Sequence, residues 1–338
     1  MKIMKARIIF LLAGFLSITA LQAQDVRYTQ MYSNPLRLNP ALMGPNYHYN
    51  FNLGYRSQWS SVGDGFNTGQ FTFMMPILMQ DNGHKLDIGL SVLSDEQGAF
   101  STLDAALSIG YTLKLSSTGH FLSAAISGGY VQSSLDANNL TFDEQYQQGS
   151  FSENNPSGEN LLVDQVSYVD AGMGLLWYYN PARDSAAGSI NAFAGVSAFH
   201  INEPANSFTD GTSAIPRRIT TIAGIKIFTN GKVDFTPQIR YDEQEGASEF
   251  ATGFYTGYSV SEDFRGVLGL WYRDQNAFAF VLGINWKYFT LGYSYDLPGS
   301  ELSTSISEAS VNEITLGFKL SRGSKKGIEY NPSPFDPF

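Results

Sequence analysis

The chain of 338 residues contains no cysteine. A disulfide framework, a thiolate metal site and a cysteine nucleophile are therefore excluded. Charged residues are also scarce: they make up 15% of the chain, against about a quarter in average soluble proteins. Positive charge is the scarcer sign, with 21 Lys and Arg against 31 Asp and Glu. This balance argues against nucleic acid as a partner, because phosphate binding needs concentrated Lys and Arg.

Long hydrophobic runs are missing except at the N-terminus. There, Lys2, Lys5 and Arg7 precede an apolar run over residues 8–21, and a small residue follows at Ala23. This order is typical of a secretory signal peptide, and the run is shorter than the roughly 20 residues of a spanning helix. We therefore expect residues 1–23 to be removed on export. The rest of the chain has no run long enough for an inner-membrane helix.

Aromatic residues, at 14%, and the 33 glycines are abundant. Residues 47–56 read YHYNFNLGYR, in which aromatic or aliphatic residues alternate with polar ones or glycine throughout. Such a period of two indicates a β-strand with one apolar face. The apolar face either covers the core of a soluble sandwich or faces the lipid around an outer-membrane barrel.

The rest of the chain favours the barrel. The same period recurs in about fourteen segments, most clearly over residues 66–77, 85–93, 103–115 and 167–179. Many segments have ten or more residues, as a tilted membrane-spanning strand needs, whereas soluble strands average about five or six. When successive connections are assigned alternately to two ends, the three longest fall at the same end: residues 132–164, 201–216 and 297–310. Outer-membrane barrels sort short periplasmic turns from long external loops in this way.

We therefore predict an all-β protein whose residues 47–321 form a transmembrane antiparallel β-barrel of about fourteen strands in the outer membrane. The apolar face of each strand would contact lipid. Tyr47, Tyr55 and Trp59 would lie at the membrane interfaces, where aromatic side chains concentrate.

Signals for catalysis are weak. The four histidines, His48, His84, His120 and His200, have no partners at metal-ligand spacing, and no hydrolase or phosphate-loop motif is present. Asp104 and Asp170 are predicted to join a polar network in the lumen. We predict no enzyme, cofactor or metal site, although strands could still assemble a hydrolase from distant residues.

Two segments differ from a barrel wall. Residues 24–46 contain two Asn-Pro turns and many apolar residues, which indicates packing into the barrel mouth or on a partner. Residues 322–338 hold three prolines and several aromatic residues. We expect them to form an extended periplasmic tail suited to docking on another protein.

The sequence also resembles the PorP/SprF family of type IX secretion system outer-membrane proteins. The resemblance rests on YTQMYSNPLRLNPALMG at residues 28–44, FAGVSAFHINEP at 193–204, IPRRIT at 215–220, and LGYSYDLPGSEL at 291–302 followed by SVNEITLGFKL. Two departures are Asn312, where the family usually has His, and a C-terminal PSPFDPF in place of the family's Cys-Pro.

The resemblance implies a role in secretion or gliding motility without catalysis. Its implied partners are the periplasmic ring proteins of the secretion system, a large secreted adhesin, or both, with outer-membrane lipid around the barrel. The motif residues expected to hold the plug or form a partner surface are Asn34, Pro35, Leu38, Asn39, Pro40, Gly44, His200, Tyr293, Tyr295 and Asp296. A pore for small or lipidic solutes and a barrel-borne hydrolase are the alternatives.

Overall fold

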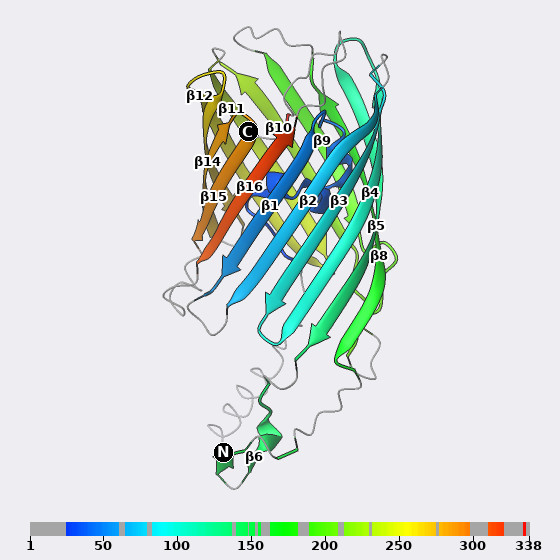
Figure 1. Ribbon diagram of the computed structural model, residues 1–338, viewed down its shortest axis with the longest axis vertical. Helices are drawn as coiled ribbons and strands as arrows, with labels where there is room; N and C mark the ends of the chain where they lie inside the picture. Colours follow the sequence, from blue (N-terminus) through cyan, green and yellow to red (C-terminus); the bar gives the residue numbers. More distant parts are fainter. Residues whose placement is uncertain are drawn as a thin grey trace, which may run out of the picture.

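A computed structural model shows fourteen antiparallel strands closed into a barrel (Figure 1). The structure describes residues 25–60, 65–79, 83–136, 140–147, 149–152, 155–156, 163–181, 189–208, 213–229, 232–274, 277–297, 310–320 and 334–335. The predicted signal peptide lies outside the described residues. Of the predicted C-terminal tail, only Pro334 and Phe335 are described.

The strands of the barrel follow one another around the wall in chain order. They are β1 (Tyr49–Gln58), β2 (Phe66–Met79), β3 (Lys85–Gln97), β4 (Phe100–Lys114), β5 (His120–Leu135), β8 (Gln165–Tyr179), β9 (Ile190–Phe199), β10 (Arg218–Phe228), β11 (Val233–Gln244), β12 (Ala247–Ser259), β13 (Phe264–Arg273), β14 (Ala277–Trp286), β15 (Phe289–Leu297) and β16 (Val311–Leu320). The short elements are η1 (Met31–Ser33), α2 (Pro35–Leu38), η2 (Pro40–Met43) and η4 (Asp143–Gln145), with a small hairpin of β6 (Tyr146–Gln147) and β7 (Ser150–Phe151).

The barrel closes between its first and last strands. β1 pairs with β16 from Tyr49↔Leu320 to Gln58↔Val311, so the wall has no open edge with unpaired backbone groups. The prediction of a closed antiparallel barrel of about fourteen strands is confirmed. Among the described residues, no helix has the length and apolar character needed to cross a membrane.

The alternation in the sequence separates the two faces of the wall. On β4, Leu103, Leu107 and Ile109 face outward with 50%, 65% and 54% of their surfaces exposed. On β2, Thr68 and Thr72 face inward and are fully buried. The two faces therefore meet different surroundings, as the period of two predicts.

One expected interface residue is placed differently. Tyr47 precedes β1, and its ring lies 4.7 Å from the ammonium group of Lys85, a side chain that is only 2% exposed inside the barrel. Tyr47 therefore faces the interior and not the lipid. The reason is that the chain enters β1 from the lumen, so alternation outward begins only at Tyr49.

The two ends of the barrel differ, and we name them by their connections. At the turn end, where β1 begins and β16 ends, the connections have two to ten residues. At the loop end, three connections are longer, with 29, 18 and 13 residues at positions 136–164, 200–217 and 298–310. The β6–β7 hairpin belongs to the first of these and projects from the barrel (Figure 1). The predicted sorting of long connections to one end is confirmed.

Candidate functional site

The N-terminal residues 25–46 lie inside the barrel, and we call them the luminal segment (Figure 1, dark blue). Its two Asn-Pro pairs start the short helices α2 and η2, because proline suits the first helical position. The side chain of Asn39 accepts a hydrogen bond of 2.9 Å from the backbone N–H of Ala41 and caps η2. These turns fold the segment compactly enough to fill the lumen.

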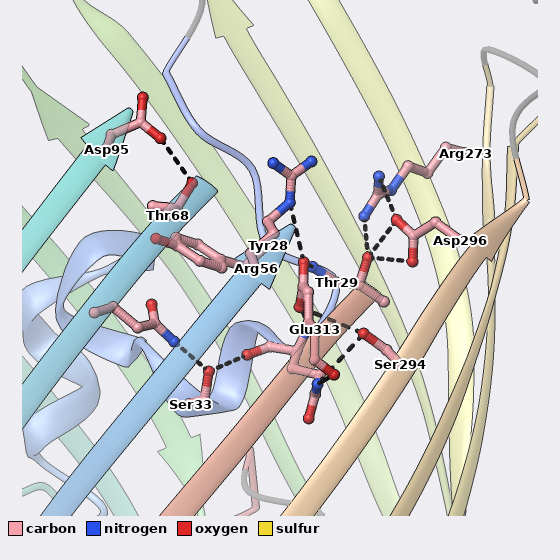
Figure 2. Close-up of polar contacts among 12 residues, drawn as sticks. Tyr28, Thr29, Ser33, Arg56, Thr68, Asp95, Arg273, Ser294, Asp296 and Glu313 are labelled. Atoms are coloured by element: carbon pink, nitrogen blue, oxygen red, sulfur yellow. Dashed lines mark hydrogen bonds and ion pairs between the residues drawn. The ribbon is translucent and has the colours of Figure 1, made fainter. Parts of the chain in front are cut away.

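The upstream part of the segment, residues 25–33, is held mainly by charged groups of the wall (Figure 2). The backbone N–H groups of Thr29 and Gln30 each donate to the Glu313 carboxylate at 2.9 Å, and Arg56 pairs with that carboxylate at 3.3 Å. The Thr29 hydroxyl donates to Asp296 at 2.7 Å. The Thr29 hydroxyl also accepts a hydrogen bond from Arg273 of β13. Groups of β16, β15 and β13 thus bind this stretch directly, and Arg56 of β1 supports it through Glu313.

At the loop end, the luminal segment begins with Asp25, which takes part in a series of ion pairs with the wall. The Asp25 carboxylate lies 2.8 Å from His200 Nε2 and 3.0 Å from an Arg218 nitrogen, while His200 Nδ1 lies 2.9 Å from Asp170. Burial alone would lower the pKa of His200, but its hydrogen bonds to both carboxylates and their negative charges raise it to about 9. His200 therefore carries a positive charge near neutral pH and bridges the segment to the wall.

The pKa of Asp25 moves in the opposite direction. Burial would raise it, but the Arg218 charge and the hydrogen bond from His200 hold the pKa well below its ordinary value of 3.8. Near neutral pH, Asp25 is therefore ionised while His200 is protonated. The contact is an ion pair between two elements 175 residues apart in sequence.

The downstream part, residues 34–46, is held mainly by apolar packing. Leu36, Leu42 and Met43 are 2%, 4% and 1% exposed. The wall makes room for them with glycine: a Cβ on Gly89 would lie only 2.7 Å from Leu36 Cδ1 and 2.8 Å from the Met43 sulfur. Close approach of backbone and side chain requires glycine at such positions.

Asn39 is the polar centre of this downstream part. Its side-chain amide donates to the carbonyls of Leu175 and Val196 on the adjacent strands β8 and β9, at 3.1 and 3.2 Å. A Cβ on Gly174 would collide with the Asn39 oxygen. Nearby, Arg37 pairs with Asp104 of β4, so both predicted luminal aspartates do take part in polar contacts.

Most of the motif residues gather in the lumen. Asn34, Pro35, Leu38, Asn39 and Pro40 are buried, and the Gly44 carbonyl accepts from the Tyr178 hydroxyl at 3.1 Å. Asp296 and His200 bind the luminal segment, as described above. Tyr293 and Tyr295, on the opposite face of β15 from Asp296, point outward and are 40% and 36% exposed. Any partner surface on these residues therefore stays a prediction.

The charged wall residues that hold the segment are not among the residues predicted from the sequence, notably Arg56, Arg218, Arg240, Glu249 and Glu313. Arg240, for instance, pairs with Glu249 and donates to the Tyr28 carbonyl at 3.2 Å. Their only signal in the sequence is a charge at a polar-face position of a predicted strand. Within the tail, Phe335 is 4% exposed and its ring meets that of Phe193 edge-on at 5.5 Å.

The arrangement around His200 does not suit a hydrolase. A catalytic histidine must accept a proton from a nucleophile through a free ring nitrogen, whereas both nitrogens of His200 are bound to carboxylates. Within the described parts of the chain, no group of three or more His, Cys, Asp or Glu side chains is placed to hold a metal ion.

Comparison with known proteins gives a family and a fold. Among solved structures, the toluene transporter TodX of Pseudomonas putida is similar, with a TM-score of 0.54 at 11% identity over 88% of this chain and 95% of that one. The monoaromatic hydrocarbon channel CymD gives 0.52 at 8% identity over 86% and 94%. These identities show a shared fold only, and a search of the curated proteins finds no match. A family model described as "Type IX secretion system membrane protein PorP/SprF" matches residues 20–318. The chain therefore belongs to the PorP/SprF family of type IX secretion system membrane proteins.

Proposed function

We propose that this protein is an outer-membrane component of the type IX secretion and gliding machinery that anchors other proteins rather than conducting solutes. The proteins anchored would be the periplasmic ring, a secreted cell-surface adhesin, or both. Family membership supports the link to this secretion system, and the closed barrel with an apolar outer face supports a place in the outer membrane. No catalytic step is part of this proposal.

The main observation in support of the anchoring role is that the luminal segment occupies the lumen. The luminal segment contacts the wall on all sides, from Glu313 on β16 to Asn39 against β8 and β9. A conducting pore needs a continuous water path, whereas here buried side chains such as Leu36 and Met43 occupy the lumen. A barrel closed by its own chain serves as a rigid support in the membrane.

A solute pathway is the second candidate. The likeness to a toluene transporter and a hydrocarbon channel favours it, as does an apolar hollow of about 570 Å³ on the outer wall, lined by Ile109, Met173 and Leu175 among others. It would require displacement of the luminal segment. Planar-bilayer conductance and toluene uptake by vesicles test it, since an anchor is silent in both.

The Asn-Pro pair at Asn39 and Pro40 provides the test of the anchoring role. We expect the double variant Asn39→Ala, Pro40→Ala to insert into the outer membrane but to lose cargo secretion and partner pull-down, because the downstream part would no longer be held between β8 and β9. The matched control is Asn180→Ala, Pro181→Ala, an Asn-Pro pair in the turn between β8 and β9.

Heat-modifiable electrophoretic mobility of the outer-membrane fraction checks insertion in both variants. Secretion at the normal level by an inserted Asn39→Ala, Pro40→Ala protein would refute the proposed role of the luminal segment. Large currents from the unaltered protein would favour the pore instead.

A further inference from the structure

A cavity of about 570 Å³ lies at the loop end, next to the luminal segment. Val26, Tyr28 and Arg37 of the luminal segment form one side, and Asn206 and residues 213–216 of the β9–β10 connection form another. The remaining lining comes from the inner faces of β3, β4, β5, β8, β9 and β10, together with Asp25, His200 and Glu245. We call it the loop-end cavity. Its volume lies within the range of about 300–1,000 Å³ for pockets that bind small ligands or peptide side chains.

Negative charge prevails in the loop-end cavity. Its lining carries five carboxylates, Asp25, Asp95, Asp104, Asp170 and Glu245, against the cations Arg37, Arg218 and His200. The cations already pair with Asp25, Asp104 and Asp170.

Asp95 differs from these paired carboxylates. It is 7% exposed, and its hydrogen bonds come from neutral groups, the Thr68 hydroxyl at 2.7 Å and the Gln97 amide at 2.6 Å. Its negative charge is therefore not neutralised by a contact with a cation among the described residues.

Five buried side-chain atoms in the lining have no hydrogen-bond partner among the described residues: Tyr28 Oη, Asp104 Oδ1, Asn206 Oδ1 and the Nε atoms of Arg37 and Arg218. Two of them, Tyr28 Oη and Asp104 Oδ1, matter most here. Within the described parts of the chain, neither Asp104 Oδ1 nor the Tyr28 hydroxyl has a hydrogen-bond partner, although both residues are only 8% exposed. Buried polar groups in native proteins usually have partners, so unsatisfied atoms that line a cavity are available to a group that enters it. In Figure 2, the Tyr28 ring points towards Thr68 and Asp95.

The strand register brings the two carboxylates together. Asp95 lies opposite Thr102, and Asp104 lies opposite Leu93, across the β3–β4 pair. Asp95 and Asp104 are thus diagonal neighbours on the inner face, with side chains about 7 Å apart at the Cβ atoms. At this separation, one ammonium or guanidinium group can donate to both carboxylates.

We propose that the loop-end cavity binds a basic peptide segment, with a Lys or Arg side chain between Asp95 and Asp104 and a neighbouring peptide carbonyl on the Tyr28 hydroxyl. This inference rests on the proposed anchoring function and names the chemistry of a partner on the loop side. A peptide fits better than a free amine because the lining offers unpartnered donors, Tyr28 Oη and the Nε atoms of Arg37 and Arg218, beside the acceptor Asp104 Oδ1.

The test uses the full-length purified barrel in detergent with a fluorescent acetyl-Ala-Lys-Ala-amide probe. Two competitors accompany it: the same peptide with norleucine for Lys, and n-butylammonium as a free cation. We expect the norleucine peptide to bind about tenfold more weakly, the effect of losing one charge-assisted hydrogen bond. Equal binding of the Lys and norleucine peptides would overturn the proposal. Equal binding of the free cation would overturn its peptide part.

Three variants sharpen the test. Asp95→Asn keeps an oxygen that accepts from Thr68, and the Gln97 amide can turn to accept from the new NH2 group. This variant should weaken binding of the Lys peptide about tenfold. Tyr28→Phe should weaken the peptide about fivefold and leave butylammonium unchanged. The control Asp263→Asn, at an exposed carboxylate of the turn end, should change neither. Unchanged affinity in Asp95→Asn, with heat-modifiable mobility showing a folded barrel, refutes the site.

Failure of the site and failure of the proposed function are distinguishable. Peptide binding is measured on the isolated protein, whereas anchoring is measured as secretion and pull-down in cells. If Asp95→Asn weakens peptide binding as expected but leaves secretion unchanged, the result supports the loop-end cavity as a binding site. It then counts against a role of this site in anchoring. Loss of secretion in the Asn39→Ala, Pro40→Ala protein with normal peptide binding supports both.

Discussion

The upstream and downstream parts of the luminal segment occupy the same lumen but are held by different forces. Residues 25–33 depend on ion pairs and charge-assisted hydrogen bonds with Glu313, Asp296, Arg218 and His200. Residues 34–46 depend on buried apolar side chains fitted against glycines of the wall. Charge contacts respond to pH and to single charge changes, whereas apolar packing responds to lost volume.

This difference predicts that the two parts of the segment respond differently to pH and to substitution. Burial of its apolar surface stabilises the downstream part in the lumen with little dependence on pH. The upstream part lies beside the loop-end cavity and is held by groups whose charges can change. The following variants test whether the two parts are separable, in order of expected effect.

Removal of Glu313 is expected to have the largest effect. Glu313→Ala leaves the buried Arg56 without its ion-pair partner and two backbone N–H groups without an acceptor. Breaking a buried pair from one side costs about 3–5 kcal/mol. Urea unfolding in lipid vesicles should show this loss of unfolding free energy, and bilayer currents should rise as the upstream part detaches.

The matched control for Glu313→Ala is Glu243→Ala, an exposed glutamate on β11, which should change neither quantity. Currents that stay at the unaltered level in a destabilised Glu313→Ala barrel would show that the two parts do not separate.

Truncation of the Leu36 side chain tests the apolar packing of the downstream part. Leu36→Ala removes a side chain that is 2% exposed and should lower the unfolding free energy by about 2–5 kcal/mol through lost burial and a residual cavity. The effect should not depend on pH. Leu115→Ala, in a turn where the side chain is 54% exposed, is the control and should cost much less. A similar cost at both positions would contradict the assignment of apolar packing to residues 34–46.

The effect of pH on the attachment of the upstream part is expected to be somewhat smaller than the effects of these two substitutions. The pKa of His200 is raised from 6.5 to about 9, so its stabilisation is complete below pH 6.5 and is lost as pH rises through about 9. The loss amounts to about 3 kcal/mol. The lowered pKa of Asp25 adds a contribution that is present above its ordinary value of 3.8 and disappears in stronger acid. Attachment should thus be strongest between about pH 4 and 6.5.

Unfolding free energy measured across this range, for the unaltered protein and for His200→Gln, checks the prediction. The groups facing His200 are Asp25 and Asp170, with Arg218 beyond Asp25. His200→Gln should abolish the decline between pH 6.5 and 9. A decline that persists in this variant would show that another group titrates there.

Much of this protein was predictable from the sequence because alternation is local. In YHYNFNLGYR, the period of two separates an outward from an inward face whatever lies around the strand, and the length of the segments and the sorting of connections indicate a membrane barrel. The Asn-Pro pairs likewise predict turns at Asn34 and Asn39 before any packing is known.

Only the tertiary structure decided which inward residues meet. Thr29 and Glu313 are 284 residues apart, and Asp25 and His200 are 175 apart. Their contact depends on barrel closure and on the path of the luminal segment, which no local pattern contains. The same holds for Tyr47, whose place in an alternating run predicted a lipid contact although the chain enters β1 from inside. Periodicity assigns a side chain to a face, whereas the closed register of the strands determines its neighbour on that face.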